Sequence, residues 1–274
     1  MVNTSNQAPE KVETVQGVLV ANGVSMTFNP GTSKEVVAFR DISFSLGTGE
    51  ILAIVGPSGC GKSTLFNIIA GLLEPSAGSV VVDGAVVSGA QGQVGYMLQK
   101  DLLLPWRSVL ENVTLGLEVR GGDAAKARDT ALALIRTYGL AGFENALPKS
   151  LSGGMRQRVA FMRTLALDPK VILLDEPFSA LDFQTRLILQ ADVKRIIRSR
   201  NKAAILVTHD IGEAISMADR VLVLSHRPAT VKSIHRIELD IASEDAVAMR
   251  RSARFNEYFD QIWSDLDIQV QAMA

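Results

Sequence analysis

Length, composition and charge place this chain among ordinary globular proteins. Its 274 residues suffice for one sizeable α/β domain, and hydrophobic and charged fractions of 47% and 21% are typical of such domains. The formal net charge of -1 argues against nucleic acid as the main binding partner. A single cysteine, Cys60, excludes an internal disulfide and fits a reducing compartment.

Nothing in the sequence predicts insertion into a membrane. No apolar run reaches the roughly 18 residues that a spanning helix needs. Residues 1–16 lack the basic start and apolar stretch of a secretory signal, and their polar composition predicts a disordered leader. We therefore expect a soluble protein, or one that is peripheral to a membrane.

Residues 17–46 predict short β-strands. β-rich pieces cover residues 18–21, 24–28 and 42–46, and a turn signal follows the second piece. Phe28 ends that piece directly before the turn. Periodicity alone leaves open whether its ring is ordinary half-buried packing or part of a binding site.

The segment Gly56–Thr64 has the sequence GPSGCGKST and fits the pattern G-x-x-x-x-G-K-[ST]. It lies between residues 51–55, expected to be a buried strand, and residues 65–70, expected to be a helix that ends at the following glycine. Its glycines let the backbone turn N–H groups toward a phosphate. Lys62 can reach the β- and γ-phosphates and the Ser63 hydroxyl can bind Mg²⁺, so this loop predicts a nucleoside triphosphate site.

A helical segment then interrupts the strands. Strands are expected at residues 79–84 and 94–98, and residues 99–166 follow a helical pattern, with one helix over residues 123–138. This order indicates a helical subdomain inserted between strands of the core. Gln99 lies at the junction, where a neutral amide could ligate Mg²⁺ or orient water.

Strands return later and alternate with helices. We expect strands at residues 171–174, 203–207 and 221–224, and helices at about 183–199 and 211–219. Such alternation indicates an α/β fold with a mostly parallel sheet covered on both faces. Phosphate sites in such sheets lie beyond the carboxyl ends of the strands, where the glycine-rich loop, Asp175 and His209 all fall.

Two carboxylates follow the strand at residues 171–174. Asp175 is placed to hold the Mg²⁺ shell, and Glu176, which should point to the opposite face, could polarise a water that attacks the γ-phosphate. An acidic pair at a strand end is often only a cap, but a phosphate loop upstream favours the catalytic interpretation. His209 follows another strand; a lone histidine there is usually structural, but this strand end should face the phosphate.

The stretch LSGGMRQRVA, Leu151–Ala160, predicts a second anion-binding helix terminus. Ser152, Gly153 and Gly154 open a helix whose first N–H groups are free to bind a phosphate. One nucleotide does not need two such cradles. The second is therefore expected to serve another nucleotide or another subunit.

Taken in order, GPSGCGKST, Gln99, LSGGMRQR, VILLDEP, SALD and His209 resemble the ATP-binding subunit of an ABC transporter, over roughly residues 18–228. The resemblance implies a P-loop NTPase (RecA-like) core with an N-terminal antiparallel β subdomain and an inserted helical subdomain at about 100–166, all within residues 17–240. Residues 241–274 would form a C-terminal helical extension. The resemblance also implies a head-to-tail dimer, with itself or a closely related subunit, that sandwiches two ATP molecules.

The same resemblance implies residue roles. Phe28 would stack on adenine, Glu176 would be the general base, His209 would touch the γ-phosphate and Asp182 would communicate across the dimer interface. The residues expected to bind nucleotide are Phe28, Gly56, Pro57, Ser58, Gly59, Cys60, Gly61, Lys62, Ser63, Thr64, Ser152, Gly153, Gly154 and Asp182, with Ser152 and Gly154 acting on the other copy's ATP. The expected catalytic residues are Lys62, Gln99, Glu176 and His209, and the expected Mg²⁺ ligands are Ser63, Gln99 and Asp175.

A narrower resemblance lies in residues 97–121. Their LLPW-x-[ST]-V-x-x-N-V pattern is similar to that of importers of the nitrate, sulfonate, taurine and bicarbonate group. The later LSHRPA segment is similar to the same group, although Ala229 stands where glycine is usual. Within LSGGMRQR, Met155 stands where many ABC subunits have glutamine. Apolar residues here could belong to the core or form a groove for a transmembrane permease, contacted near Leu104 and Trp106. The resemblance favours the groove.

These features predict an ATP-hydrolysing subunit, peripheral to the cytoplasmic face of the inner membrane. It would power permease subunits, with an extracytoplasmic solute-binding protein as an indirect partner and a small anion or sulfonate-like solute. One alternative is a soluble ABC ATPase of DNA repair, chromosome maintenance or cluster assembly, although no heptads for long arms are present. A P-loop kinase is another, but it would leave the LSGG stretch without a role.

Two further expectations concern single features. Cys60, near a helix N-terminus, should have a depressed pKa and react with thiol reagents unless ATP is bound. An apolar stripe at helical spacing predicts a C-terminal helix packed on the core; its members are Phe255, Phe259, Ile262, Trp263 and Leu266.

Overall fold

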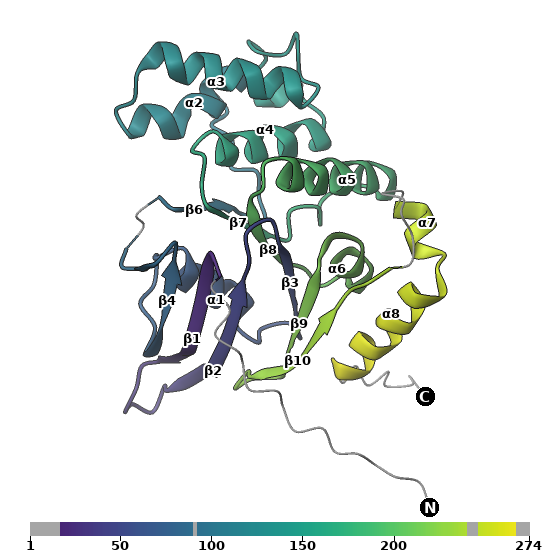
Figure 1. Cartoon of the computed structure of the whole chain (residues 1–274). Helices are drawn as coiled ribbons and strands as arrows, with labels where there is room; N and C mark the ends of the chain where they lie inside the picture. Colours follow the sequence, from purple (N-terminus) through teal and green to yellow (C-terminus); the bar gives the residue numbers. More distant parts are fainter. Residues whose placement is uncertain (1–16, 90–91, 240–245, 267–274) are drawn as a thin grey trace, which may run out of the picture.

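The computed structural model describes residues 17–89, 92–239 and 246–266, and the leader expected at residues 1–16 lies outside them. These ranges form two sheets, a group of helices beside them and a C-terminal pair of helices (Figure 1). The strands are β1 Leu19–Phe28, β2 Val36–Leu46, β3 Ile51–Val55, β4 Ala77–Val82, β5 Ala85–Val86, β6 Val94–Met97, β7 Val171–Asp175, β8 Ala203–Val207, β9 Arg220–Leu224 and β10 Val231–Arg236. The α-helices are α1 Lys62–Ile69, α2 Val109–Val119, α3 Ala124–Thr137, α4 Gly153–Leu165, α5 Phe183–Ser199, α6 Ile211–Met217, α7 Ala246–Arg250 and α8 Ala253–Asp265.

The six-stranded sheet has the order β10-β9-β3-β8-β7-β6 and is parallel except for β10. Its central strands are continuous apolar runs because helices or the second sheet cover both faces. Alternate residues of β3 show this directly: Ile51, Ala53 and Val55 belong to one buried cluster, whereas Leu52 and Ile54 belong to another. β10 was not predicted, because its half-buried and exposed residues at the sheet edge carry no continuous apolar run.

The four-stranded sheet has the order β2-β1-β4-β5 and is antiparallel. The two separate pieces expected at residues 18–28 form one strand, β1, with register shifts between Ala21 and Thr27. Gly23 has a φ of 57°, so the chain bends there without leaving the sheet. An isolated bridge between Phe39 and Ala229 links this sheet to the loop between β9 and β10.

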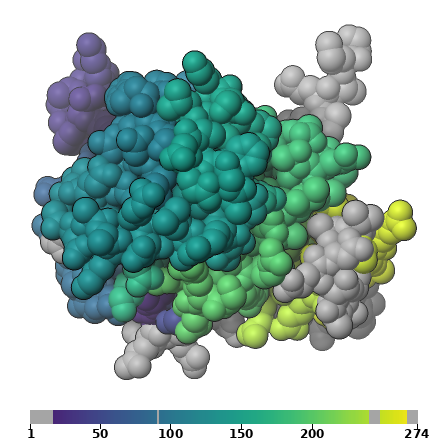
Figure 2. Space-filling view, turned by 90° about the horizontal axis from the view of Figure 1, so that it is seen from above, coloured from purple at the N-terminus to yellow at the C-terminus, as the bar shows by residue number. Residues whose placement is uncertain are grey.

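Between β6 and β7 the chain forms α2, α3 and α4, as the helical pattern predicted. Figure 2 shows these teal segments spread over the face seen from above. Each helix begins at a polar side chain that accepts a hydrogen bond from its first turn: Ser108 forms a capping box with Glu111, Asp123 caps α3 and Ser152 caps α4. The predicted helix over 123–138 therefore corresponds to α3 and its two caps.

The C-terminal helix α8 packs through the predicted stripe. Phe255, Ile262 and Leu266 are buried, whereas Trp263 is half-exposed and its ring stacks on Phe259 with centroids 6.1 Å apart. Its last residue, Asp265, accepts hydrogen bonds from the side chains of Ser233 and His235 on β10. The helix is thus fixed to the sheet edge by apolar packing and by a polar cluster.

Candidate functional site

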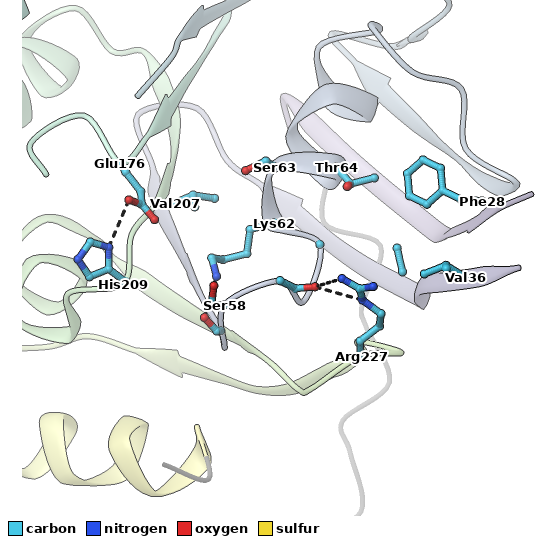
Figure 3. A pocket seen from close by; sticks show the side chains of 14 residues that line it. Phe28, Val36, Ser58, Lys62, Ser63, Thr64, Glu176, Val207, His209 and Arg227 are labelled. Carbon is cyan, nitrogen blue, oxygen red and sulfur yellow. Dashed lines mark hydrogen bonds and ion pairs between the residues drawn. The ribbon is translucent and has the colours of Figure 1, made fainter. Parts of the chain in front are cut away.

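A cavity of about 480 Å³ lies where the glycine-rich loop at residues 56–64 (the P-loop), the antiparallel sheet and the carboxyl ends of the parallel strands meet (Figure 3). Phe28 forms one side of this cavity, and Glu176 and His209 form the other, with the P-loop between them. The lining residues are Phe28, Val36, Ala38, Gly56, Ser58, Gly59, Gly61, Lys62, Ser63, Thr64, Glu176, Val207, His209 and Arg227. The cavity thus collects most of the predicted nucleotide-binding residues from both sheets.

The loop between β3 and α1 has the backbone that its glycines predict. Gly59 and Gly61 have φ values of 74° and 111°, which favour glycine. At Gly61 a Cβ atom would also lie 2.9 Å from Cδ1 of Phe39, a fully buried ring. The loop can therefore lie this close to the antiparallel sheet only because residue 61 has no side chain.

Lys62 bends back over the loop that precedes it. Its ammonium donates to the carbonyl oxygens of Gly56 at 2.7 Å and Pro57 at 3.0 Å. The Lys62 side chain is therefore held against the carbonyl oxygens of its own loop and lines the cavity (Figure 3). A fixed positive charge inside a loop of backbone donors suits a polyphosphate.

Asp175 ends β7 as a nearly buried carboxylate. Burial raises its pKa first of all, and the neighbouring charge of Glu176 raises it further, whereas hydrogen bonds from Tyr96 and Ser63 lower it. The Tyr96 hydroxyl donates to Asp175 Oδ2 at 3.2 Å, and burial followed by the charge of Asp175 raises the pKa of this tyrosine. Tyr96 was not among the predicted site residues, because its only signal in the sequence is an aromatic residue near the end of β6.

Ser63 and Asp175 bring a hydroxyl and a carboxylate oxygen to one place, and both suit Mg²⁺. Within the described ranges no group of three or more histidine, cysteine or acidic side chains could hold a metal ion by itself. Mg²⁺ at nucleotide sites uses one or two protein ligands together with phosphate oxygens, so these residues fit that ion.

Two polar side chains, Gln99 and His209, contact the same carboxylate oxygen of Glu176. Gln99 Nε2 donates to Glu176 Oε2 at 3.0 Å, and His209 Nδ1 lies 3.3 Å from the same oxygen. The Glu176 backbone is in the left-handed region with a φ of 45°, and its N–H is held by the carbonyl oxygen of Val207 at 2.9 Å. Residues from three strand ends therefore converge on this carboxylate, which faces the cavity while Asp175 faces Tyr96.

The LSGG stretch at residues 151–154, called the signature below, and Asp182 lie away from the P-loop cavity. Ser152 caps α4, and Ser152 and Gly154 line a separate cavity of about 270 Å³ together with Met155. Asp182 accepts a hydrogen bond from the N–H of Thr185 at 3.0 Å and caps α5. None of these residues lines the P-loop cavity. One copy of the chain therefore does not bring the signature and the P-loop into one site.

The prediction for Cys60 was wrong. Its side chain is 1% exposed, and burial raises its pKa despite the opposing charges of Lys62 and Arg227. The helix terminus next to it would favour a thiolate, but desolvation in the core dominates.

The apolar stretch before α2 divides between the core and the surface. Leu103 is buried, whereas Leu102 and Trp106 are 53% and 72% exposed. Asn112, fully buried on α2, holds this stretch by accepting from the N–H of Leu104 at 2.8 Å and donating to its carbonyl oxygen at 3.2 Å. Asn112 thus fixes the loop that presents Trp106, a role that was not predicted for it.

The fold and the cavity together define a P-loop nucleoside triphosphatase. A family model described as ABC transporter matches residues 39–179. The ABC transporter ATP-binding protein YtlC of Bacillus subtilis is 46% identical over 85% of this chain and 90% of that protein. The chain belongs to the ABC transporter family.

Relatives with more specific names point the same way. The taurine import ATP-binding protein TauB of Pseudomonas entomophila is 40% identical over 89% of this chain and 95% of that protein. The aliphatic sulfonates import ATP-binding protein SsuB 1 of Xanthomonas axonopodis is 46% identical over 73% and 80% of the two chains. A dimeric structure of the ATP-binding cassette MJ0796, bound to ADP and Pi, covers 80% of this chain and 99% of its own, with 31% identity and a TM-score of 0.69.

These similarities confirm three predictions: that the chain is an ABC transporter ATP-binding subunit, that it has the P-loop NTPase fold, and that it hydrolyses ATP to power a membrane ABC importer. They do not favour the soluble alternative in DNA repair or cluster assembly. Within the described residues no helix has the length and apolar character needed to cross a bilayer.

Proposed function

We propose that this chain powers uptake of a sulfonate or a similar small organic anion, by binding and hydrolysing MgATP at the P-loop cavity. The relatives named for taurine and aliphatic sulfonates support the solute class. The convergence of Lys62, Glu176 and His209 on one cavity is the observation that carries the site assignment.

In the proposed binding mode, Phe28 stacks on the adenine and the backbone of residues 56–64 surrounds the phosphates. Lys62 turns from the loop carbonyls toward the β- and γ-phosphates. Ser63, Asp175 and Gln99 would hold Mg²⁺, which neutralises phosphate charge when bound. A positive charge nearby would favour the ionised form of Asp175, whose pKa burial raises.

In the proposed reaction, Glu176 accepts a proton from the attacking water. Gln99 and His209 hold the Glu176 carboxylate, so it is oriented before the water arrives. His209 also reaches the γ-phosphate. The two neighbouring carboxylates have different proposed roles because their surroundings differ: Asp175 is buried beside Tyr96, and Glu176 faces the cavity.

Dimerisation completes the site in this proposal. Ser152 and Gly154 lie away from their own chain's P-loop cavity, so they would act on the ATP of a second copy or of a closely related subunit. The dimeric MJ0796 cassette supports this pairing. Asp182, at the start of α5, would transmit closure from one site to the other.

Permease subunits would contact the surface around Leu104 and Trp106. Trp106 is 72% exposed and the loop beneath it is fixed by Asn112, which suits a rigid docking surface. The chain would then lie on the cytoplasmic face of the inner membrane, with an extracytoplasmic solute-binding protein as an indirect partner. The proposed division is an ATPase domain at residues 17–240, including the helical subdomain at about 100–166, and an extension at residues 241–274.

The proposal is tested by isolating the tagged chain from detergent-solubilised membranes and by measuring uptake. We expect an apolar integral-membrane permease to co-purify. Cells that contain the Glu176→Gln variant should lose uptake of labelled taurine or an alkanesulfonate while nitrate and bicarbonate uptake are unchanged. Loss of nitrate or bicarbonate uptake instead would reject the sulfonate class, and recovery of only soluble or nucleic-acid partners would reject the permease assignment.

A further inference from the structure

Arg227 lies at the rim of the P-loop cavity. It belongs to the LSHRPA segment but is not one of the predicted site residues. It is carried by the loop between β9 and β10 and lines the cavity together with Val36 and Gly59 (Figure 3). Its guanidinium donates twice to one acceptor: Nη2 lies 2.7 Å and Nε 3.2 Å from the carbonyl oxygen of Gly59. A side chain that is distant in sequence therefore forms two hydrogen bonds with the backbone of the P-loop.

The loop that carries Arg227 is itself fixed in place. The N–H of Ala229 donates to the carbonyl oxygen of Ala38 at 3.0 Å, and the N–H of Arg40 donates to that of Ala229 at 2.9 Å. Within the loop, the N–H of Thr230 donates to the Ser225 hydroxyl at 3.0 Å. Arg227 is therefore mounted on a turn bonded to β2, the strand that also forms the cavity wall at Ala38.

The position of the Gly59 carbonyl decides where the next N–H points. In a planar trans peptide the C=O and the following N–H point in opposite directions. When Arg227 holds the Gly59 oxygen at the rim, the N–H of Cys60 is directed to the inside of the loop, where it lies 3.3 Å from the carbonyl oxygen of Pro57. Gly59 has a φ of 74° and no side chain, so its peptide is held by hydrogen bonds at its two ends, from Arg227 to the Gly59 oxygen and from the Cys60 N–H to Pro57.

We infer that Arg227 is a positioning residue that locks the Gly59–Cys60 peptide of the P-loop in its phosphate-binding orientation. A guanidinium suits this role because its planar fork supplies two N–H donors from one side chain, whereas a lysine ammonium is a point charge on a flexible stem. The inference rests on the proposed nucleotide site for its effect on ATP, but not for its effect on the loop itself.

The single cysteine provides a test that needs no nucleotide. Cys60 is 1% exposed in the ordered loop. In the nucleotide-free protein we expect Arg227→Met to raise the rate of Cys60 alkylation by iodoacetamide at least about tenfold, because a loop that opens more often exposes its thiol more often. Arg236→Met is the matched control, since it removes a positive charge from β10 at a side chain that is 81% exposed. Its labelling rate should equal that of the wild type.

The kinetic test separates positioning from chemistry. Arg227→Met should raise KM for ATP about tenfold with kcat within about twofold, since loss of a charge-assisted hydrogen bond weakens the cradle but leaves Glu176 and His209 unchanged. Arg227→Lys keeps the charge and should behave like Arg227→Met in both assays. If Arg227→Met does not fold, the same two measurements on Arg227→Lys test the positioning role of Arg227.

The outcomes distinguish this inference from the site assignment. Wild-type labelling in Arg227→Met, or wild-type labelling and KM in Arg227→Lys, would overturn the inference. Lys62→Ala tests the site: if it binds ATP normally, the proposed nucleotide site fails, and the labelling result still decides the role of Arg227. If Arg227→Met raises KM without changing the labelling rate, the guanidinium contacts the nucleotide directly and the positioning role is rejected.

Discussion

His209 and Glu176 face each other across one end of the P-loop cavity, with Nδ1 of the imidazole 3.3 Å from Oε2 of the carboxylate. The two residues follow the neighbouring strands β8 and β7, so the parallel register of the sheet brings them together. Gln99, which follows β6, donates to the same oxygen at 3.0 Å. The carboxylate is therefore oriented by side chains on both sides.

Replacing this carboxylate should separate binding from hydrolysis. Glu176→Gln keeps the shape of the side chain but removes the proton acceptor, so we expect ATP hydrolysis to fall by about 10²–10⁴ while ATP affinity stays within a few-fold of the wild type. Size-exclusion chromatography with MgATP should then show an accumulated dimer. Unchanged turnover would reject Glu176 as the general base.

Cys60 should be inert in the wild-type protein. Because its side chain is 1% exposed and burial raises its pKa, little thiolate forms at neutral pH and reagents cannot reach it. We expect slow alkylation with and without ATP, and fast alkylation only in denaturant. Rapid labelling of the native, nucleotide-free protein would contradict the buried position.

Trp106 should matter for assembly and not for basal hydrolysis. Truncation of an exposed aromatic anchor at an interface costs about 2 kcal/mol or more, which corresponds to roughly 30-fold weaker association. Trp106→Ala should therefore weaken co-purification of the permease and leave the ATPase activity of the isolated subunit within about twofold. Trp263→Ala, at a half-exposed tryptophan on α8, is the control. Lost basal activity with normal permease binding would place Trp106 in the ATPase core instead.

Glu213 should give the protein a pH-dependent stability. This carboxyl on α6 is 4% exposed, and burial raises its pKa although hydrogen bonds from Thr208 and from Gln190 lower it. The folded state then binds a proton more tightly than the unfolded state. Its stabilising contribution is present below the ordinary glutamate pKa and is lost as pH rises through the native value, by at most about 1.4 kcal/mol per pH unit.

Denaturant unfolding at several pH values tests this effect. The free energy of unfolding of Glu213→Gln should fall less with rising pH than that of the wild type, because the amide does not titrate. Glu257→Gln, at an exposed position of α8, should follow the wild-type profile. Parallel profiles for Glu213→Gln and the wild type would show that burial does not shift this carboxyl.

The sequence by itself determined the parts of this protein that depend on local chemistry. The P-loop, the carboxylates at the end of β7 and the LSGG helix start could be predicted because each needs particular residue types at fixed spacing. The order of strands and helices followed from apolar periodicity, and it placed Asp175 and His209 at the same sheet edge as the P-loop. The separate role of the signature could also be inferred, since one nucleotide does not need two cradles.

Only the tertiary structure decided which groups are buried and which distant residues meet. Local sequence favoured a reactive Cys60, but packing beneath the P-loop removed it from water and reversed the direction of its pKa shift. Tyr96 reaches Asp175, and Arg227 reaches Gly59, across 79 and 168 residues of chain. Such pairs depend on sheet order and loop anchoring, which arise from packing of the whole core and leave no periodic signal in the sequence.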